Sequence, residues 1–283
     1  MFRLFFLLPC LLLLWHTATA QRTPAQDSPP EPVYRVKPLP ELAASAVGLG
    51  ATIYAFQVIN DKDRINVADY DRADVPGFDR WAFPESFERA GEASAASDLG
   101  FYAGIGLPFA LFVDPGARQE YFKVITMYFE AQAANGLLYA ASPLGPLFID
   151  RARPNVYYPE QFEDGTTDGG DRNGFFSGHV STTATGTFFT AKVLSDFHPE
   201  WSGGTRALVY GLASLPPAYV SIQRVRALKH FPSDTVVGFA VGAALGILTP
   251  ELHKRWQRRH RSSISVSGGL SDGAGALGLS MTF

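Results

Sequence analysis

Residues 223–234 read QRVRALKHFPSD, and residues 176–179 read FSGH. The first stretch holds Arg224, His230 and Asp234 in the order R-x5-H-x3-D. An arginine fork matches two oxygens of a phosphate group, an imidazole can act as nucleophile or acid, and a carboxylate can fix the tautomer of an imidazole. These residue types in this order predict chemistry on a phosphate ester, and the rest of the chain is expected to hold them in place.

The two histidines are expected to have separate roles. We expect His230 to attack phosphorus as a neutral imidazole, with Asp234 accepting a hydrogen bond from its other nitrogen. We expect His179 to protonate the leaving oxygen and then to activate water, so that the phosphohistidine is hydrolysed. This chemistry requires no metal ion and no other cofactor.

The phosphate ligands are expected to come from two arginines and the start of a helix. Arg153, followed by Pro154, and Arg224 would clamp the oxygens of a five-coordinate phosphorus. Ser177 and Gly178 lie where a helix is predicted to begin, and free N–H groups and the helix dipole favour an anion there. Glycine also lets a phosphate approach the backbone closely.

This set of residues resembles the type 2 phosphatidic acid phosphatase (PAP2) superfamily, which includes bacterial class A acid phosphatases and vanadium haloperoxidases. The family pattern is K-x6-R-P, then P-S-G-H, then S-R-x5-H-x3-D. The resemblance covers roughly residues 99–248. It implies a helical bundle and phosphomonoesterase activity, with His230 as nucleophile, Asp234 as its partner and His179 as acid and base. It also implies that Arg153, Ser177, Gly178 and Arg224 bind phosphate.

The chain departs from the family pattern at three positions. Pro146 occupies the place of the first-motif lysine, Phe176 replaces a proline, and Gln223 replaces a serine. Loss of a charged phosphate contact costs about 1.5–3 kcal/mol if nothing replaces it. Arg151, two residues before Arg153, is the nearest substitute, and Lys229 and Arg226 are less favoured ones.

Composition and punctuation predict an all-α bundle with a short C-terminal β-hairpin or extended tail. The turn residues 114–116 and 142–146 separate helical segments, and alternation of apolar residues after residue 263 is typical of strands. The helical domain is expected over residues 42–252, followed by a basic segment and a strand pair over 253–283. The expected helices are 42–59, 85–98, 99–112, 118–139, 179–197, 205–221 and 233–248.

The N-terminus predicts export. Residues 1–20 have a positive n-region, an apolar h-region and a small-x-small cleavage site, and cleavage there would remove Cys10, the one cysteine. Residues 21–41 are rich in proline and are expected to form a tether. The expected location is the periplasm or the cell envelope. A net charge of −3 predicts no nucleic-acid partner.

The sequence leaves membrane insertion open. Charged residues such as Lys123 and Lys192 lie inside expected helices, where they are costly in a bilayer. Spans that follow a cleaved signal would also put the basic run 253–261 outside, against the positive-inside rule. These observations favour a soluble or peripherally bound bundle, with a six-span integral membrane protein as the alternative.

The favoured function is a phosphatase that acts on a phosphorylated small molecule or lipid, with possible peripheral membrane association. One alternative is a vanadate-dependent haloperoxidase, in which His230 would ligate vanadium instead of attacking phosphorus. A second alternative is a non-catalytic envelope protein that binds phosphate or lipid and has lost turnover together with the lysine.

Overall fold

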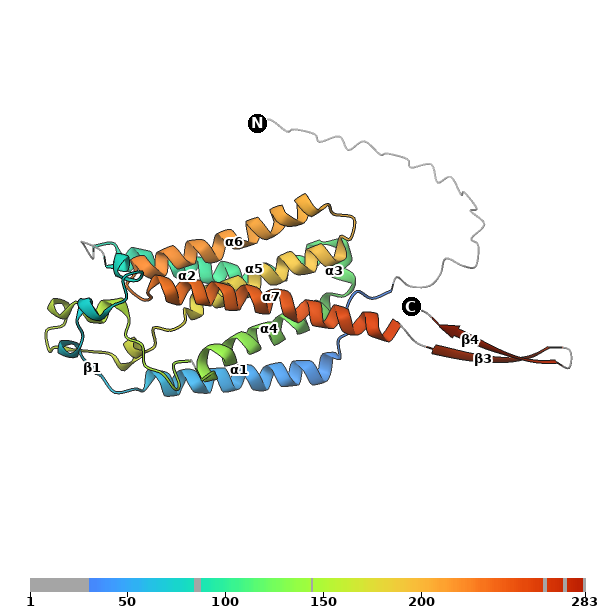
Figure 1. Ribbon diagram of the computed structural model, residues 1–283, viewed down its shortest axis with the longest axis horizontal. Helices are drawn as coiled ribbons and strands as arrows, with labels where there is room; N and C mark the ends of the chain where they lie inside the picture. The colour runs from blue at the N-terminus through green and yellow to red at the C-terminus, as the bar shows by residue number, and fades with distance from the viewer. Residues whose placement is uncertain (1–30, 84–87, 144, 262–263, 272–273, 282–283) are drawn as a thin grey trace, which may run out of the picture. The chain divides into compact units, whose positions relative to one another are not determined.

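The structure is a computed structural model that describes residues 31–83, 88–143, 145–261, 264–271 and 274–281. Within these ranges the chain has seven α-helices, which confirms the predicted all-α class (Figure 1). The predicted export signal, residues 1–20, lies outside the described residues. The helices are α1 (Pro38–Asn60), α2 (Ala90–Gly106), α3 (Pro115–Gln119), α4 (Tyr121–Ala141), α5 (Gly178–Phe197), α6 (Gly203–Arg226) and α7 (Pro232–Arg261).

Helix α5 is the centre of the bundle and packs against α2, α4, α6 and α7, while α1 packs on α4. Small residues allow these helices to approach closely. A Cβ atom on Gly186 of α5 would collide with the carbonyl oxygen of Gly104 in α2, and one on Gly242 of α7 would collide with the carbonyl oxygen of Ser181 in α5. Close backbone packing through glycine is typical of helix pairs in membrane proteins.

Two helices differ in extent from the sequence expectation. The segments expected at 85–98 and 99–112 are joined, because α2 runs without a break to Gly106 and continues as the 3₁₀ helix η4 (Leu107–Val113), which contains Pro108. Helix α7 does not end before Pro250 but continues to Arg261, so the expected basic segment belongs to this helix. Packing of α7 along α4 and α5 outweighs the one hydrogen bond that a proline removes.

The described end of the expected tether packs on the bundle. Tyr34 is fully buried, and its hydroxyl donates to Asp196 Oδ2 (2.9 Å). The Val33 N–H donates to Glu120 Oε1 (2.5 Å). Apolar side chains at 33, 34 and 36 explain the difference from the expectation, because they join the core between α4 and α5.

The start of α1 and the end of α7 lie against each other. The Arg35 N–H donates to the carbonyl oxygen of His253 (3.3 Å), and His253 Nδ1 donates to the carbonyl oxygen of Arg35 (2.7 Å). The Nε2 atom of His253 lies 2.8 Å from Glu130 Oε2. These contacts are made at the end of the bundle opposite to the loops that join α1 to α2 and α4 to α5 (Figure 1).

Charged residues inside α4 and α5 are paired with other charged groups. Lys192 contacts Asp196 Oδ2 (2.6 Å) and Glu251 Oε2 (2.8 Å), and Lys254 contacts Asp196 Oδ1 (2.5 Å). Lys123 contacts Glu120 Oε2 (3.0 Å). Paired charges cost far less in an apolar environment than isolated ones, so these residues do not argue against membrane insertion.

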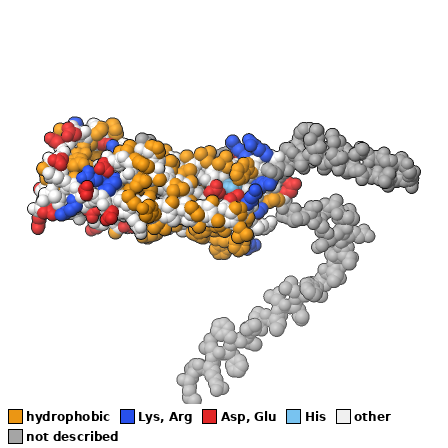
Figure 2. All heavy atoms as spheres, turned by 90° about the horizontal axis from the view of Figure 1, so that it is seen from below, with side chains coloured by type: hydrophobic (Ala, Val, Ile, Leu, Met, Phe, Trp, Pro, Cys, Tyr) orange, Lys and Arg blue, Asp and Glu red, His pale blue; other side chains and the backbone are white. Residues whose placement is uncertain are grey.

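The outer faces of the bundle are apolar. Side chains such as Ile53, Phe122 and Leu212 are exposed, and Figure 2 shows hydrophobic side chains over the middle of the bundle, with charged ones gathered toward its two ends. Within the described residues, three segments are long and apolar enough, by length and composition, to cross a membrane: Pro38–Asn60, Ala90–Val113 and Pro232–Arg259. The chain thus has membrane-associated character.

Two small antiparallel sheets complete the described chain. Strand β1 (Ile65–Asn66) pairs with β2 (Thr166–Thr167). Strand β3 (Ile264–Ser271) pairs with β4 (Ala274–Met281), with Val266 opposite Leu279. The predicted C-terminal hairpin is confirmed.

Candidate active site

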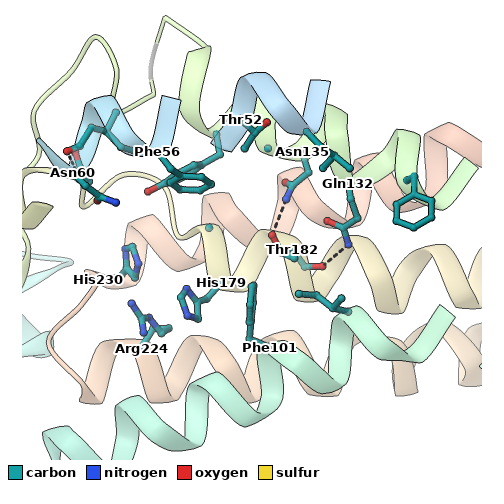
Figure 3. Close-up of a pocket in the computed structure, with 18 of the residues that line it drawn as sticks. Thr52, Phe56, Asn60, Phe101, Gln132, Asn135, His179, Thr182, Arg224 and His230 are labelled. Atoms are coloured by element: carbon teal, nitrogen blue, oxygen red, sulfur yellow. Dashed lines mark hydrogen bonds between the residues drawn. The ribbon is translucent and has the colours of Figure 1, made fainter. Parts of the chain in front are cut away.

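A cavity of about 500 Å³ reaches the end of the bundle where α5 and α7 begin and α6 ends. The predicted residues Arg153, Gly178, His179, Arg224 and His230 all line it. Figure 3 shows His230, His179 and Arg224 grouped at one end of this cavity. We call Arg153, Gly178, His179, Arg224 and His230 the cradle.

His230 is held by a backbone carbonyl. Its Nδ1 atom lies 2.7 Å from the oxygen of Gly174, so Nδ1 carries the proton and donates it to this acceptor. In the neutral ring the other nitrogen, Nε2, is then unprotonated. Burial, followed by the positive charges of Arg224 and Arg153, holds the pKa of His230 well below its ordinary value. His230 is therefore a neutral imidazole with a free electron pair near pH 7.

Asp234 does not make the expected hydrogen bond to His230. The closest approach of its carboxylate to His230 Nδ1 is 4.0 Å, which is too long for a hydrogen bond. Asp234 is the third residue of α7, and its Oδ2 accepts from the N–H of Phe231 (2.8 Å). This is the reach-back of a helix cap, and it takes the carboxylate away from the imidazole.

Arg151 is not part of the cradle. Its guanidinium lies 2.8 Å from Asp79 Oδ2, and its Nε lies 2.7 Å from Asp234 Oδ1 in an ion pair whose angle falls short of a hydrogen bond. Asp79 also accepts from the N–H (3.0 Å) and the hydroxyl (2.8 Å) of Ser233. We call Asp79, Arg151, Ser233 and Asp234 the buried ion network. Arg151 thus neutralises buried carboxylates and does not line the cavity.

A strained turn separates Arg224 from His230. Helix α6 ends at Arg226, and Leu228 adopts a φ of 58° in the left-handed region, which usually requires glycine. The Lys229 N–H then donates to the carbonyl oxygen of Arg224 (3.1 Å). The turn therefore brings the arginine at the end of α6 and the histidine before α7 into one cavity, and strain of this kind is common at functional sites.

Both cradle arginines keep part of the guanidinium free. Arg224 is buried, contacts Ser97 Oγ (3.3 Å) and approaches Asp98 Oδ1 (3.9 Å), while Arg153 approaches Asp171 Oδ1 (3.4 Å). The Nε atoms of Arg153 and Arg224 are buried and have no hydrogen-bond partner among the described residues. Buried donors are normally satisfied, so these two atoms are suited to donate hydrogen bonds to the oxygens of an anion in the cavity.

The start of α5 forms the floor of the cradle. Ser177 is the N-cap residue, its N–H donates to the carbonyl oxygen of Asp234 (3.0 Å), and its buried Oγ has no partner among the described residues. The expectation of free backbone donors therefore applies to the residues from Gly178 onward and not to the N–H of Ser177. Gly178 packs against the ring of Tyr139, and both line the cavity. The first turn of α5 thus directs its dipole at the cradle.

Asp98 is one of two site residues whose role the sequence did not reveal. Its Oδ1 lies 3.0 Å from Nε2 of His179, and it comes from α2, outside every recognised motif. Burial, followed by the positive charge of Arg224, lowers the pKa of His179 to about 4, and the carboxylate of Asp98 orients the imidazole and opposes this shift. Asp171 was missed for the same reason: it accepts from Asn155 (2.8 Å) as well as contacting Arg153. A single aspartate in a helix or loop carries no spacing signal.

Pro146 stands at the sequence position of the missing lysine, and its backbone carbonyl group takes part in a hydrogen bond. The carbonyl oxygen of Pro146 accepts a hydrogen bond from Lys62, whose ammonium also contacts Asp150 (2.8 Å). Lys229, a less favoured substitute, is half-buried, and burial and then the charge of Arg153 lower its pKa. Lys229 does not line the cavity, but it adds to the positive field around the cradle.

The helical bundle holds two imidazoles and two guanidinium groups in one cavity, and the dipole of a helix points at them. These features define an anion-binding protein of the kind that transfers phosphoryl groups. Residues 121–258 match the family model described as PAP2 superfamily, so this part of the chain belongs to that superfamily. The predicted recognition of the family is confirmed, and the match supports a phosphatase of the PAP2 type.

One solved structure is similar to the chain. It is the crystal structure described as the first transmembrane PAP2 type phosphatidylglycerolphosphate phosphatase from Bacillus subtilis. The two chains are 18% identical, with a TM-score of 0.43, and the alignment covers 77% of this chain and 96% of that one. No curated protein matches the sequence.

Proposed function

We propose that the protein hydrolyses phosphate monoesters of lipids through a phosphohistidine on His230. The observation that carries the proposal is the cradle: His179, His230, Arg153 and Arg224 line the same cavity, and both arginines have buried donors without a partner among the described residues. Arg153 and Arg224 would bind the phosphoryl oxygens and stabilise the charge that develops on them in the transition state.

The first step is attack by His230. Its Nε2 donates an electron pair to phosphorus, the bond between phosphorus and the ester oxygen breaks, and the electrons of that bond leave with the oxygen. The hydrogen bond from Nδ1 to Gly174 holds the ring in the required tautomer, and the lowered pKa keeps it neutral. The helix cap made by Asp234 holds the turn that carries His230.

The second imidazole moves the protons. His179 gives a proton to the departing oxygen, so the alcohol is released neutral. The neutral His179 then takes a proton from a water molecule, the water oxygen attacks phosphorus, and the bond to Nε2 of His230 breaks. Inorganic phosphate leaves, and both imidazoles return to their starting state. Asp98 positions His179 for both transfers.

Two features support a lipid substrate. The cavity continues from the cradle between apolar walls that include Leu49, Phe56 and Phe109, and it lies among helices whose outer faces are apolar. We propose that the bundle is embedded in a membrane, with the cradle at one surface. Export through residues 1–20 to the periplasm or cell envelope remains a prediction.

The experiment that tests the proposal is rapid-quench hydrolysis of a 1-acyl-glycerol-3-phosphate, labelled in its phosphate group, by purified protein in detergent micelles. The wild type is expected to show a burst of acid-labile, protein-bound phosphate, and His230→Ala is expected to show none and to lose steady-state turnover. His198→Ala, at a histidine far from the cradle, is the matched control and keeps both. Equal turnover by His230→Ala and the wild type would refute the proposal.

A further inference from the structure

A polar cluster interrupts the apolar part of the cavity. Gln132 and Asn135 on α4 face Thr182 on α5, and hydrogen bonds join both amides to Thr182 (Figure 3). The cluster lies beyond His179, away from the cradle, among apolar lining residues. Polar side chains in an apolar cavity are costly, so a cluster of this kind calls for a reason beyond packing.

The donors of the cluster are used within the protein. Asn135 Nδ2 donates to Thr182 Oγ1 (3.0 Å). Gln132 Nε2 donates to the carbonyl oxygen of Thr182 (3.3 Å) and to the hydroxyl of Tyr128 (2.9 Å), which in turn donates to the carbonyl oxygen of Ile105 (2.9 Å). The carbonyl acceptor of Thr182 fixes the amide of Gln132. With Nδ2 of Asn135 donating to the Thr182 hydroxyl, Oδ1 of Asn135 points away from this contact.

Asn135 Oδ1 is left without a donor. The side chain lines the cavity, the residue is only 2% exposed, and Oδ1 has no hydrogen-bond partner among the described residues. A buried carbonyl oxygen is almost always satisfied, because an unmade hydrogen bond leaves the full cost of removing the group from water. A donor group on a ligand in the cavity would therefore satisfy Oδ1.

The separation between the cradle and Asn135 determines how far from its phosphate a substrate must carry the donor group. Thr182 follows His179 by three residues on α5, a rise of about 4.5 Å along the helix. Asn135 precedes Tyr139, which packs on Gly178, by one turn of α4. A substrate whose phosphate occupies the cradle thus brings the atoms a few bonds beyond its ester oxygen to Asn135.

We propose that Asn135 selects lipid phosphates that carry a hydroxyl or amide N–H within a few bonds of the phosphate ester. This inference rests on the proposed function and narrows its substrate class. A lysoglycerophosphate or a long-chain amino-alcohol phosphate offers such a donor. A diacylglycerol phosphate or an isoprenyl phosphate has none there and leaves Oδ1 unpaired when bound.

The test compares two substrates that differ in one group: 1-oleoyl-glycerol-3-phosphate, which has a free 2-hydroxyl, and its 2-O-methyl ether. The wild type is expected to hydrolyse the hydroxyl compound with a kcat/KM at least about tenfold higher, since a site built to accept a hydrogen bond discriminates against a ligand that lacks it. Asn135→Leu, close in size, is expected to lose this preference. Equal rates on the two substrates by the wild type would overturn the proposal.

A matched control comes from the same cavity wall. The Thr52 hydroxyl already donates to the carbonyl oxygen of Gly48 (2.9 Å), so Thr52→Val should keep the preference for the free hydroxyl. Thermal unfolding of each variant checks that it is folded, and calorimetric binding of the matching non-hydrolysable phosphonates to His230→Ala, with and without Asn135→Leu, gives a readout independent of turnover. A preference that survives Asn135→Leu in both assays refutes the role of this residue.

The same assays separate this inference from the proposed function. Hydrolysis of p-nitrophenyl phosphate that requires His230, together with equal rates on the two lipids, would leave the phosphatase standing and remove the selectivity. An absence of hydrolysis of every ester by the folded wild type would remove both. A preference for the methyl ether or for diacyl substrates would show that Asn135 meets an acceptor or a water molecule, and would overturn the proposal.

Discussion

Replacing Arg151 by methionine separates two roles that the sequence and the structure assign to this arginine. As a substitute for the missing lysine it would bind phosphate. In the structure its guanidinium instead lies between Asp79 and Asp234, whose side chains are fully buried. Methionine fills a similar volume without charge, so Arg151→Met leaves two buried carboxylates with the donors of Ser233 and one backbone N–H.

The expected cost follows from burial. Breaking a buried ion pair by removing one partner destabilises a protein by about 3–5 kcal/mol. Arg151 itself is one-third exposed, at 32%, so the lower end of this range, about 3 kcal/mol, applies. For a chain of this size a loss of about 3 kcal/mol corresponds to a fall in Tm of roughly 6–12 °C.

The assay measures Tm by intrinsic fluorescence in detergent micelles and kcat/KM on p-nitrophenyl phosphate well below Tm. Arg151→Met is expected to lower Tm by the stated amount and to change kcat/KM by less than about fivefold, since the side chain does not line the cavity. Arg64→Met, which removes an exposed ion pair to Asp164 (2.9 Å), is the control and should cost at most about 1 kcal/mol. An unchanged Tm with a kcat/KM lowered about 10- to 150-fold would refute the structural role and restore that of a phosphate ligand.

Three further predictions concern other parts of the bundle. Asp98→Asn should lower kcat by about ten- to a hundredfold and change its pH profile, because His179, which acts as acid and base, loses its charged partner. Stopped-flow rates measured across pH test this prediction, and an unchanged pH profile would contradict it. His198 lies between two carboxylates that raise its pKa, the nearer at 2.7 Å, so it stabilises the fold below pH 6.5 and loses that effect as pH rises through the raised pKa. The Tm deficit of His198→Gln should therefore be largest near pH 5.5 and fade at alkaline pH, and a deficit independent of pH would exclude this origin. Gly242→Ala should destabilise the bundle by about 1–3 kcal/mol in chemical unfolding, because the added methyl group meets the backbone of α5. Gly211→Ala, in open space on α6, is the control and should be neutral or stabilising. Similar effects of the two substitutions would argue against close helix packing.

Much of the fold could be predicted from the sequence because long apolar segments end at turn residues. Asp114, Pro115 and Gly116 separate α2–η4 from α4, and the alternation after residue 263 marks the hairpin. Helix ends were harder to place, since the packing of α7 carries it through Pro250. The charges in α4 and α5 were misleading for another reason: their partners, such as Glu251 for Lys192, come from distant parts of the chain.

The candidate site could be predicted only where residues lie in motifs. The structure brings His179, His230, Arg153 and Arg224 together, as their spacing indicated. The partners of these residues were not predictable. The carbonyl oxygen of Gly174, which replaces Asp234 beside His230, is a backbone atom that has no residue signature. The position of the Arg151 side chain could not be predicted, because proximity in sequence does not reveal a competing buried carboxylate such as Asp79.

The contact between Arg35 and His253 has a consequence for sidedness. In a bilayer, whichever compartment contains residue 35 also contains the arginine-rich end of α7, and the cradle faces the opposite compartment. A cleaved leader would deliver residue 35 to the exterior and direct the enzyme to headgroups of the inner leaflet. Cytoplasmic retention of the arginines would do the reverse. One topology reporter fused at residue 261 therefore identifies the leaflet that supplies the substrate.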